Sequence, residues 1–87
     1  MIYQRVLQKT NIVITDSEKY LQFIGNKIAE LRKLKGISQY KLAKLVMMEQ
    51  SNLARIEKGL TNPTIKTLLK ISDALEVKLS DFFSEDF

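Results

Sequence analysis

The sequence predicts an all-α domain of five short helices, preceded by a short extended arm or strand. From residue 19 onward, apolar residues recur three and four positions apart, which is the spacing of one face of a helix. Capping residues, glycines and a single proline separate these segments, whereas the stretch before residue 16 is rich in β-branched residues and lacks a helical period. We therefore divide the chain into an arm (residues 1–18), a helical domain (19–83) and a short tail (84–87).

The totals describe one ordinary globular domain. With 87 residues, of which 45% are hydrophobic and 28% are charged, the chain can bury a single modest core. No apolar run approaches the ~18 residues that span a bilayer, and no signal-peptide pattern opens the chain. We expect a cytoplasmic protein with no membrane partner.

The chain contains no cysteine and no histidine. The first absence excludes disulfides and thiol nucleophiles, and the second removes the usual general base near neutral pH and the commonest metal ligand. No pair of acidic residues converges on an evident site either. We therefore predict that the protein is not an enzyme and that it binds neither a cofactor nor a metal.

The arm leads into the first helix near Thr15. The β-branched run at residues 12–14 predicts a short strand, which pairs either with residues 5–8 or with another chain. Thr15 and Glu18 have the spacing of a capping box, and Gly36 is placed to end the helix. Its predicted apolar stripe consists of Ile24, Ile28, Leu31 and Leu34. The basic residues that lie mostly off this stripe are Lys27, Arg32, Lys33 and Lys35.

Four shorter helices follow. Ser38 caps the second helix, and the third runs over residues 50–58 and ends at a glycine. Pro63 disfavours helix at the residue before it, and Thr64 then caps the fourth helix. A last short helix begins near Leu79. The residues predicted to face inward are Leu42, Ala43, Val46, Leu53, Ile56, Ile65, Leu68, Leu69, Ile71 and Leu75, and the last helix carries Phe82 and Phe83.

Positive charge is concentrated in the middle of the chain. From Lys19 to Lys58 there are nine Lys or Arg residues against three Glu, a local net charge of +6. The remainder holds five basic and seven acidic residues, a net charge of −2. A polyanionic partner explains this bias more economically than a solvated helical surface does.

The second and third helices are short and joined by only a few residues. Such a connection suits a steep crossing of ~90–120°, the helix-turn-helix arrangement, in which the second helix of the pair protrudes. The outer face of a protruding helix can enter the major groove of double-stranded DNA.

An ordered series of residues resembles the lambda repressor and Cro type of helix-turn-helix, often called the XRE family. Its first parts are Ile37, Ser38, Gln39, Leu42 and Ala43, then Ser51, Leu53, Arg55, Ile56, Glu57 and Gly59, then Asn62 and Pro63. Its later parts are Leu68, Leu69, Lys70, Ile71, Ser72, Ala74, Leu75 and Val77, then Asp81 and Phe83. The resemblance covers roughly residues 22–83 and implies a five-helix, lambda repressor-like DNA-binding domain.

The resemblance also implies roles for individual residues. Those that match base-contacting positions are Gln50, Ser51, Asn52 and Arg55. An Arg can fork onto guanine, which is worth ~1–3 kcal/mol of discrimination, and a Gln can bond adenine. For Arg55 the alternative is a salt bridge within the domain. Those that match or extend the phosphate-contacting positions are Gln39, Tyr40, Lys41, Lys58, Thr61 and Asn62. A solvated surface explains Tyr40 and Lys41 equally well.

Two residues depart from the family pattern. Met47 stands where the family usually has Gly, at a turn position that often needs positive φ. Glu49 replaces the usual Ser or Thr cap, so we expect a weaker cap whose charge nevertheless suits the helix dipole. We expect Met47 and Met48 to pack inward. Glu57 matches a structural glutamate that accepts from nearby amides or a basic side chain.

The leading hypothesis is a sequence-specific transcriptional regulator, a repressor that binds a palindromic operator as a homodimer. Its dimer contact uses either Phe82, Phe83 and Phe87 or the N-terminal strand, unless these phenylalanines pack on their own domain. The alternative is a protein-interaction module, such as the antitoxin that binds a toxin or another protein partner. A third hypothesis, prompted by Met47 and Glu49, is a fold relic that binds no DNA.

Overall fold

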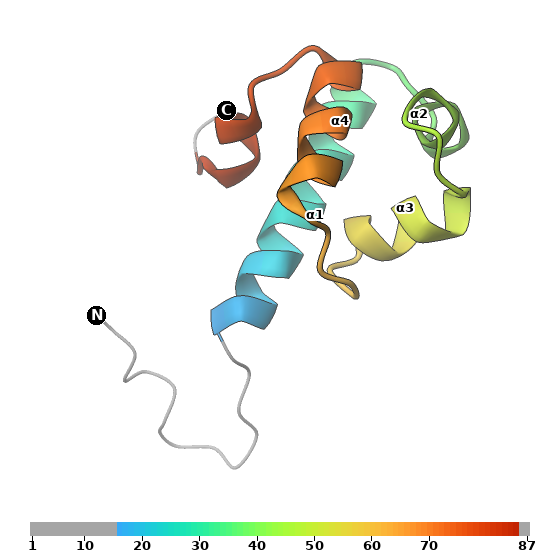
Figure 1. The fold of residues 1–87 in the computed structure, drawn as a ribbon. Coiled ribbons are helices and arrows are strands. Elements are labelled where there is room, and N and C mark those ends of the chain that lie inside the picture. Colours follow the sequence, from blue (N-terminus) through green and yellow to red (C-terminus); the bar gives the residue numbers. More distant parts are fainter. Residues whose placement is uncertain (1–15, 86–87) are drawn as a thin grey trace.

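The computed structural model describes residues 16–85, so Thr15 and the strand predicted at residues 12–14 lie outside the described residues. Within that range, the helices in chain order are α1 (Asp16–Leu34), α2 (Gln39–Leu45), α3 (Gln50–Glu57), α4 (Ile65–Leu75) and η2 (Leu79–Phe83) (Figure 1). The all-α prediction is confirmed for these residues, but the last element is a 3-10 helix rather than a fifth α-helix. Residues 16–18, which we assigned to the arm, are helical. None of the helices in residues 16–85 is long and apolar enough to cross a membrane.

The predicted capping residues lie at the N-terminal ends of α2 and α4, and a predicted glycine follows α1. The Ser38 hydroxyl accepts from the backbone N–H of Lys41 at 3.0 Å, and the Thr64 hydroxyl accepts from the backbone N–H of Thr67 at 3.1 Å. Each bond satisfies one of the backbone donors that the first turn of a helix leaves unpaired. Gly36 follows α1 with a φ of 71°, a conformation that glycine adopts without strain.

The core lies where the helices converge. α1 packs against α3 and η2, and α2 packs against α3 and α4. The innermost side chains are fully buried and come from every helix: Ile28, Leu42, Leu53, Ile71, Leu75 and Phe82. Burying side chains of this size contributes roughly 1.5–3 kcal/mol each. The core therefore fixes how α3 stands relative to the other helices.

Gly25 permits the close approach of α1 to the end of α3. A Cβ atom at this position would overlap the backbone carbonyl oxygen of Ile56 and lie 2.7 Å from that of Glu57. Because both neighbouring atoms belong to the backbone, neither can move aside as a flexible side chain would. Any larger residue at position 25 must push α3 away from α1.

Three residues predicted for the core are exposed instead. Leu34 is 71% exposed, and Ile65 and Leu69 are exposed on α4. Leu34 is the last residue of α1, and Ile65 is the first of α4, so both lie at helix ends. At these two ends the apolar periodicity continues beyond the part of the helix that other helices cover, whereas Leu69 lies in the middle of α4 and is 44% exposed.

The phenylalanines near the C-terminus divide into buried and exposed ones. Phe82 is fully buried in the core of its own domain, so for this residue the alternative of packing within the domain holds. Phe83 is about half exposed, at 47%. Phe87 lies outside the described residues.

Two basic residues expected off the apolar stripe of α1 are buried. Lys27 is 6% exposed, and its ammonium lies 5.6 Å from the centroid of the Phe23 ring. Arg32 is 8% exposed and pairs with a carboxylate of α3. Long basic side chains can follow the apolar face of a helix with their methylene groups, so helical spacing alone does not predict their burial.

Candidate nucleic-acid interface

α2 and α3 form the helix-turn-helix pair. Figure 1 shows α2 nearly along its axis while α3 runs across the view, so the two helices cross steeply. The turn between them comprises residues 46–49, and Met47 adopts a φ of 59° in it. The positive φ expected at this turn position is confirmed, although a methionine occupies it.

A buried ion pair holds the C-terminal end of α3. The Nε of Arg32 donates to Oε2 of Glu57 at 2.7 Å, and its Nη2 donates to Oε1 at 3.0 Å. The remaining guanidinium nitrogen, Nη1, donates to the backbone carbonyl of Ile37 at 2.9 Å. This fork-shaped pair connects α1, the α1–α2 loop and α3. The structural role expected for Glu57 is confirmed.

Two glutamines extend this pair toward the start of α3. Gln39 donates from Nε2 to Oε1 of Glu57 at 2.9 Å. Gln50 donates from Nε2 to Oε1 of Gln39 at 3.3 Å. Because Glu57 only accepts, it orients the Gln39 amide with its oxygen toward Gln50. One N–H of Gln39, and one N–H and the oxygen of Gln50, take no part in these two bonds.

The outer face of α3 is open to solvent. Ser51, Asn52 and Arg55 are exposed, while Leu53 and Ile56 on the opposite side are buried. Among residues 16–85, Arg55 takes part in no ion pair, so the alternative of a salt bridge within the domain is not found there. The guanidinium is therefore available to a ligand.

A shallow cleft of about 300 Å³ lies between α3 and the loop that leads to α4. Asn52, Arg55 and Thr61 line it together with Pro63 and Thr67. The structure thus brings one predicted phosphate-contacting residue next to two predicted base-contacting ones. A groove edge and the adjacent backbone of a nucleic acid present the same juxtaposition of base and phosphate.

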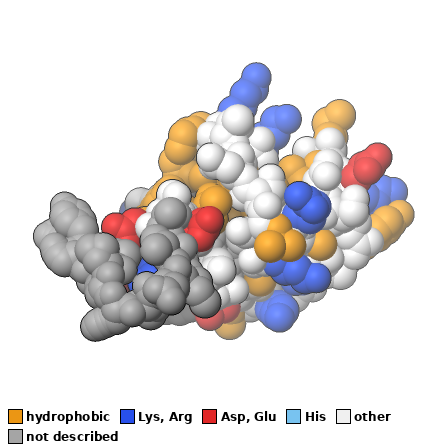
Figure 2. All heavy atoms as spheres, turned by 90° about the horizontal axis from the view of Figure 1, so that it is seen from below, with side chains coloured by type: hydrophobic (Ala, Val, Ile, Leu, Met, Phe, Trp, Pro, Cys, Tyr) orange, Lys and Arg blue, Asp and Glu red, His pale blue; other side chains and the backbone are white. Residues whose placement is uncertain are grey.

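Four other residues predicted to contact phosphates are exposed: Tyr40, Lys41, Lys58 and Asn62. The Lys44 ammonium lies 5.3 Å from the centroid of the Tyr40 ring, a cation–π contact on the exposed side of α2. Figure 2 shows Lys and Arg side chains interspersed with hydrophobic ones on the face seen from below. Asp and Glu side chains are also visible on this face, and its Lys and Arg side chains supply the charge that attracts a polyanion.

The two departures from the family pattern behave differently. Glu49 makes no side-chain capping bond at the start of α3, so the weak cap is confirmed. Met47 is 88% exposed, so the prediction that it packs inward is wrong. Met48 is half-buried and packs against the core as expected. The left-handed backbone at position 47 directs its side chain away from the domain.

Arg32 is the residue at this site that sequence reasoning did not single out. The pattern offered a partial signal, because Glu57 was expected to need a basic or amide partner. Several basic residues of α1 fitted that description equally well. Only the packing of α1 on α3 selects Arg32.

Known structures share this arrangement. The restriction-modification controller protein C.AhdI from Aeromonas hydrophila superimposes with a TM-score of 0.76 at 32% identity, over 79% of this chain and 100% of that one. The solved chain of SinR, the master regulator for biofilm formation, in complex with DNA superimposes with a TM-score of 0.66 at 39% identity, over 70% of this chain and 98% of that one.

Transcriptional regulators are similar to this chain in sequence. The chain is 36% identical over 61 residues to the HTH-type transcriptional regulator PuuR of Escherichia coli, covering 70% of this chain and 33% of PuuR. It is 41% identical over 64 residues to the HTH-type transcriptional regulator SlrR of Bacillus subtilis, covering 72% of this chain and 42% of SlrR. The chain thus spans less than half the length of either relative. Residues 28–82 match the model of the HTH_3 helix-turn-helix family. The resemblance drawn from the sequence is confirmed, and the chain belongs to the HTH_3 family.

Proposed function

We propose that the chain binds double-stranded DNA with α3 in the major groove and regulates transcription, as a repressor that occupies a palindromic operator as a homodimer. The observation that carries the proposal is the exposed face of α3. It offers the side chains of Ser51, Asn52 and Arg55 on a helix whose two ends are fixed by Gln39 and Glu57. Fixing the helix in advance lowers the entropic cost of placing these side chains on base edges.

The proposal divides the contacts into two groups. Gln50, Ser51, Asn52 and Arg55 contact bases, and Gln39, Tyr40, Lys41, Lys58, Thr61 and Asn62 contact the sugar-phosphate backbone. The relatives support the general function, since PuuR and SlrR are named as transcriptional regulators and SinR has been solved with DNA. A homodimer of this geometry reads half-sites about one helical turn, ~34–36 Å, apart.

The test is binding of the purified chain to a fluorescein-labelled duplex from upstream of its own gene, followed by anisotropy at several salt concentrations. We expect an affinity that falls steeply with salt and exceeds the affinity for a scrambled duplex by about 1,000-fold or more. Equal affinity for the two duplexes would contradict a sequence-specific regulator. Absence of binding at low salt would favour the alternative, a protein-interaction module.

The homodimer is tested separately by sedimentation of the chain with a duplex that carries both half-sites. We expect two chains per duplex, and a duplex with one half-site moved by half a helical turn should bind the second chain more weakly. Independent binding of two chains regardless of spacing would contradict the dimer and leave DNA recognition intact.

A further inference from the structure

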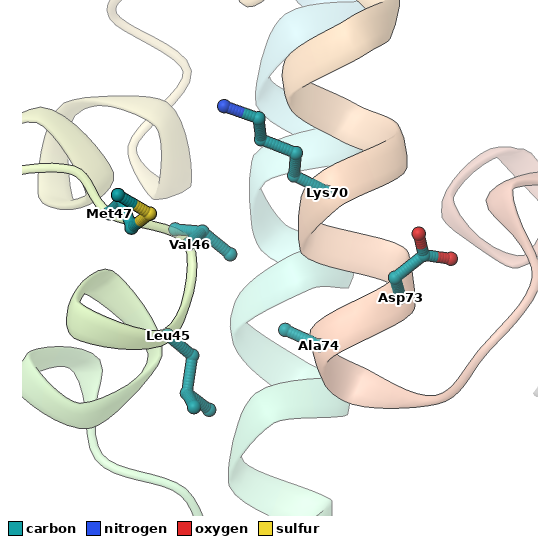
Figure 3. A pocket seen from close by; sticks show the side chains of 6 residues that line it. All are labelled: Leu45, Val46, Met47, Lys70, Asp73 and Ala74. Carbon is teal, nitrogen blue, oxygen red and sulfur yellow. The ribbon is translucent and has the colours of Figure 1, made fainter.

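A second cleft lies between the α2–α3 turn and α4, apart from the residues assigned to DNA. It has a volume of about 430 Å³, and we call it the turn cleft. Its lining residues are Leu45, Val46, Met47, Lys70, Asp73 and Ala74. Figure 3 shows Leu45, Val46 and Met47 on the side of the turn, and Ala74 and Lys70 facing them from α4. The cleft is therefore formed by two elements that are far apart in the sequence.

The walls of the turn cleft expose large apolar side chains. Leu45 is 53% exposed and Met47 is 88% exposed, whereas Val46 between them is buried. Exposure of Met47 coincides with a left-handed backbone, which L side chains adopt at a cost in free energy. The domain gains little burial from this side chain in return. The turn itself accounts for the left-handed backbone but not for a large exposed side chain on it, and methionine suits surfaces that adapt to a partner.

The lining of the turn cleft contains one basic and one acidic residue, Lys70 and Asp73. Figure 3 shows the Lys70 side chain extending toward the side of Met47, while the Asp73 carboxylate points away from the turn. Lys44 lies near the end of α2, Lys66 lies one turn before Lys70 on α4, and Glu49 is the acidic residue of the turn. An apolar cleft whose lysine extends toward the turn complements a segment that carries an apolar side chain beside an acidic one.

We propose that the turn cleft binds a partner protein through a segment that inserts a large apolar side chain between Leu45, Met47 and Ala74. An Asp or Glu next to that side chain pairs with Lys70. DNA is the less suitable occupant, because phosphates need donors and the exposed walls of this cleft are largely apolar. The site goes beyond the proposed DNA recognition and uses none of the residues assigned to it.

The experiment is a selection of phage-displayed random linear peptides against the full chain, followed by anisotropy with the most enriched peptide in synthetic, fluorescein-labelled form. We expect the enriched peptides to share an aromatic or leucine residue flanked by Asp or Glu. Met47→Gly and Leu45→Ser should each weaken binding of the peptide about tenfold, and Lys70→Glu about fivefold. Met47→Gly keeps the fold intact, because glycine tolerates the φ of 59° at this position.

The matched control is Leu34→Ser, which changes another exposed leucine outside the cleft and should leave peptide binding unchanged. Three results would overturn the proposal. The selection yields no shared acidic and apolar pattern, or the peptide binds Met47→Gly and Leu45→Ser as tightly as the unchanged chain. The third result is that Met47→Gly, Leu45→Ser and Lys70→Glu weaken binding to a random-sequence duplex and not to the peptide, which would assign the cleft to DNA.

Discussion

Arg32 and Glu57 are 25 residues apart in sequence, and the Nε of Arg32 nevertheless donates to Oε2 of Glu57 across 2.7 Å. Both side chains are buried, and Glu57 also accepts from Gln39. The pair therefore stands at the inner end of a hydrogen-bonded series that reaches Gln50 on the surface. Its geometry transmits the packing of α1 to the first residue of the helix proposed to read DNA.

Removal of one partner of this pair should be strongly destabilising. Glu57→Ala leaves the Arg32 guanidinium buried without its carboxylate, so we expect the free energy of unfolding to fall by about 3 kcal/mol. Urea denaturation followed by circular dichroism measures this loss. The double variant Arg32→Met, Glu57→Leu removes both charges and should lose less than the two single variants together. A loss below about 1 kcal/mol in Glu57→Ala would contradict the structural role of the pair.

Gln39 and Gln50 should act together in binding DNA. Either change to Ala breaks the bond between them, so the double variant should lose less affinity than the sum of the single losses, with a difference of about 0.5–1 kcal/mol. The measurement is a double-mutant cycle by anisotropy on the specific duplex. The pair Gln39→Ala and Lys58→Ala serves as the control and should be additive. Additivity in both pairs would show that the bond between the glutamines does not persist on DNA.

Arg55 and Lys58 are close in sequence, but their substitutions should have different effects on DNA binding. Arg55→Ala should remove about 1–3 kcal/mol from binding of the specific duplex and relax the preference at one base pair. Lys58→Ala should weaken all sequences alike and lower the salt dependence by about one ion. Anisotropy on a set of duplexes with single base changes distinguishes the two. Unchanged preference in Arg55→Ala would refute the assignment of the reading face.

Met47 offers a test of backbone strain that leaves the core untouched. Met47→Gly and Met47→Ala remove the same exposed side chain, but only glycine relieves the left-handed backbone. We expect the Gly variant to be more stable than the Ala variant by about 1 kcal/mol in thermal unfolding. Glu76, with a φ of 60° after α4, is a second site for the same comparison. Equal stability of the two variants at position 47 would indicate that the turn relaxes without cost.

Local signals in the sequence predicted most of what is local in the structure. Ser38 and Thr64 cap their helices, and Gly36 follows α1 with positive φ, because these effects depend only on a few neighbouring backbone atoms. The apolar spacing of Ile28 or Leu53 likewise predicted burial, since any helix of that pattern turns one face inward. The family resemblance added the roles proposed for α3.

Contacts between distant segments were decided only by the tertiary structure. The spacing placed Arg32 off the apolar stripe of α1 and Leu34 on it, but in the packed structure Arg32 is buried and Leu34 is exposed. Gly25 carries no local signal, because its requirement comes from the backbone of α3 lying against it. The same holds for the turn cleft, whose walls meet only after α4 has packed on α2. The sequence by itself determined where the helices begin and which face of each is apolar. The packing of the helices on one another decided which residues depart from that pattern, because burial depends on neighbours that are distant in the sequence.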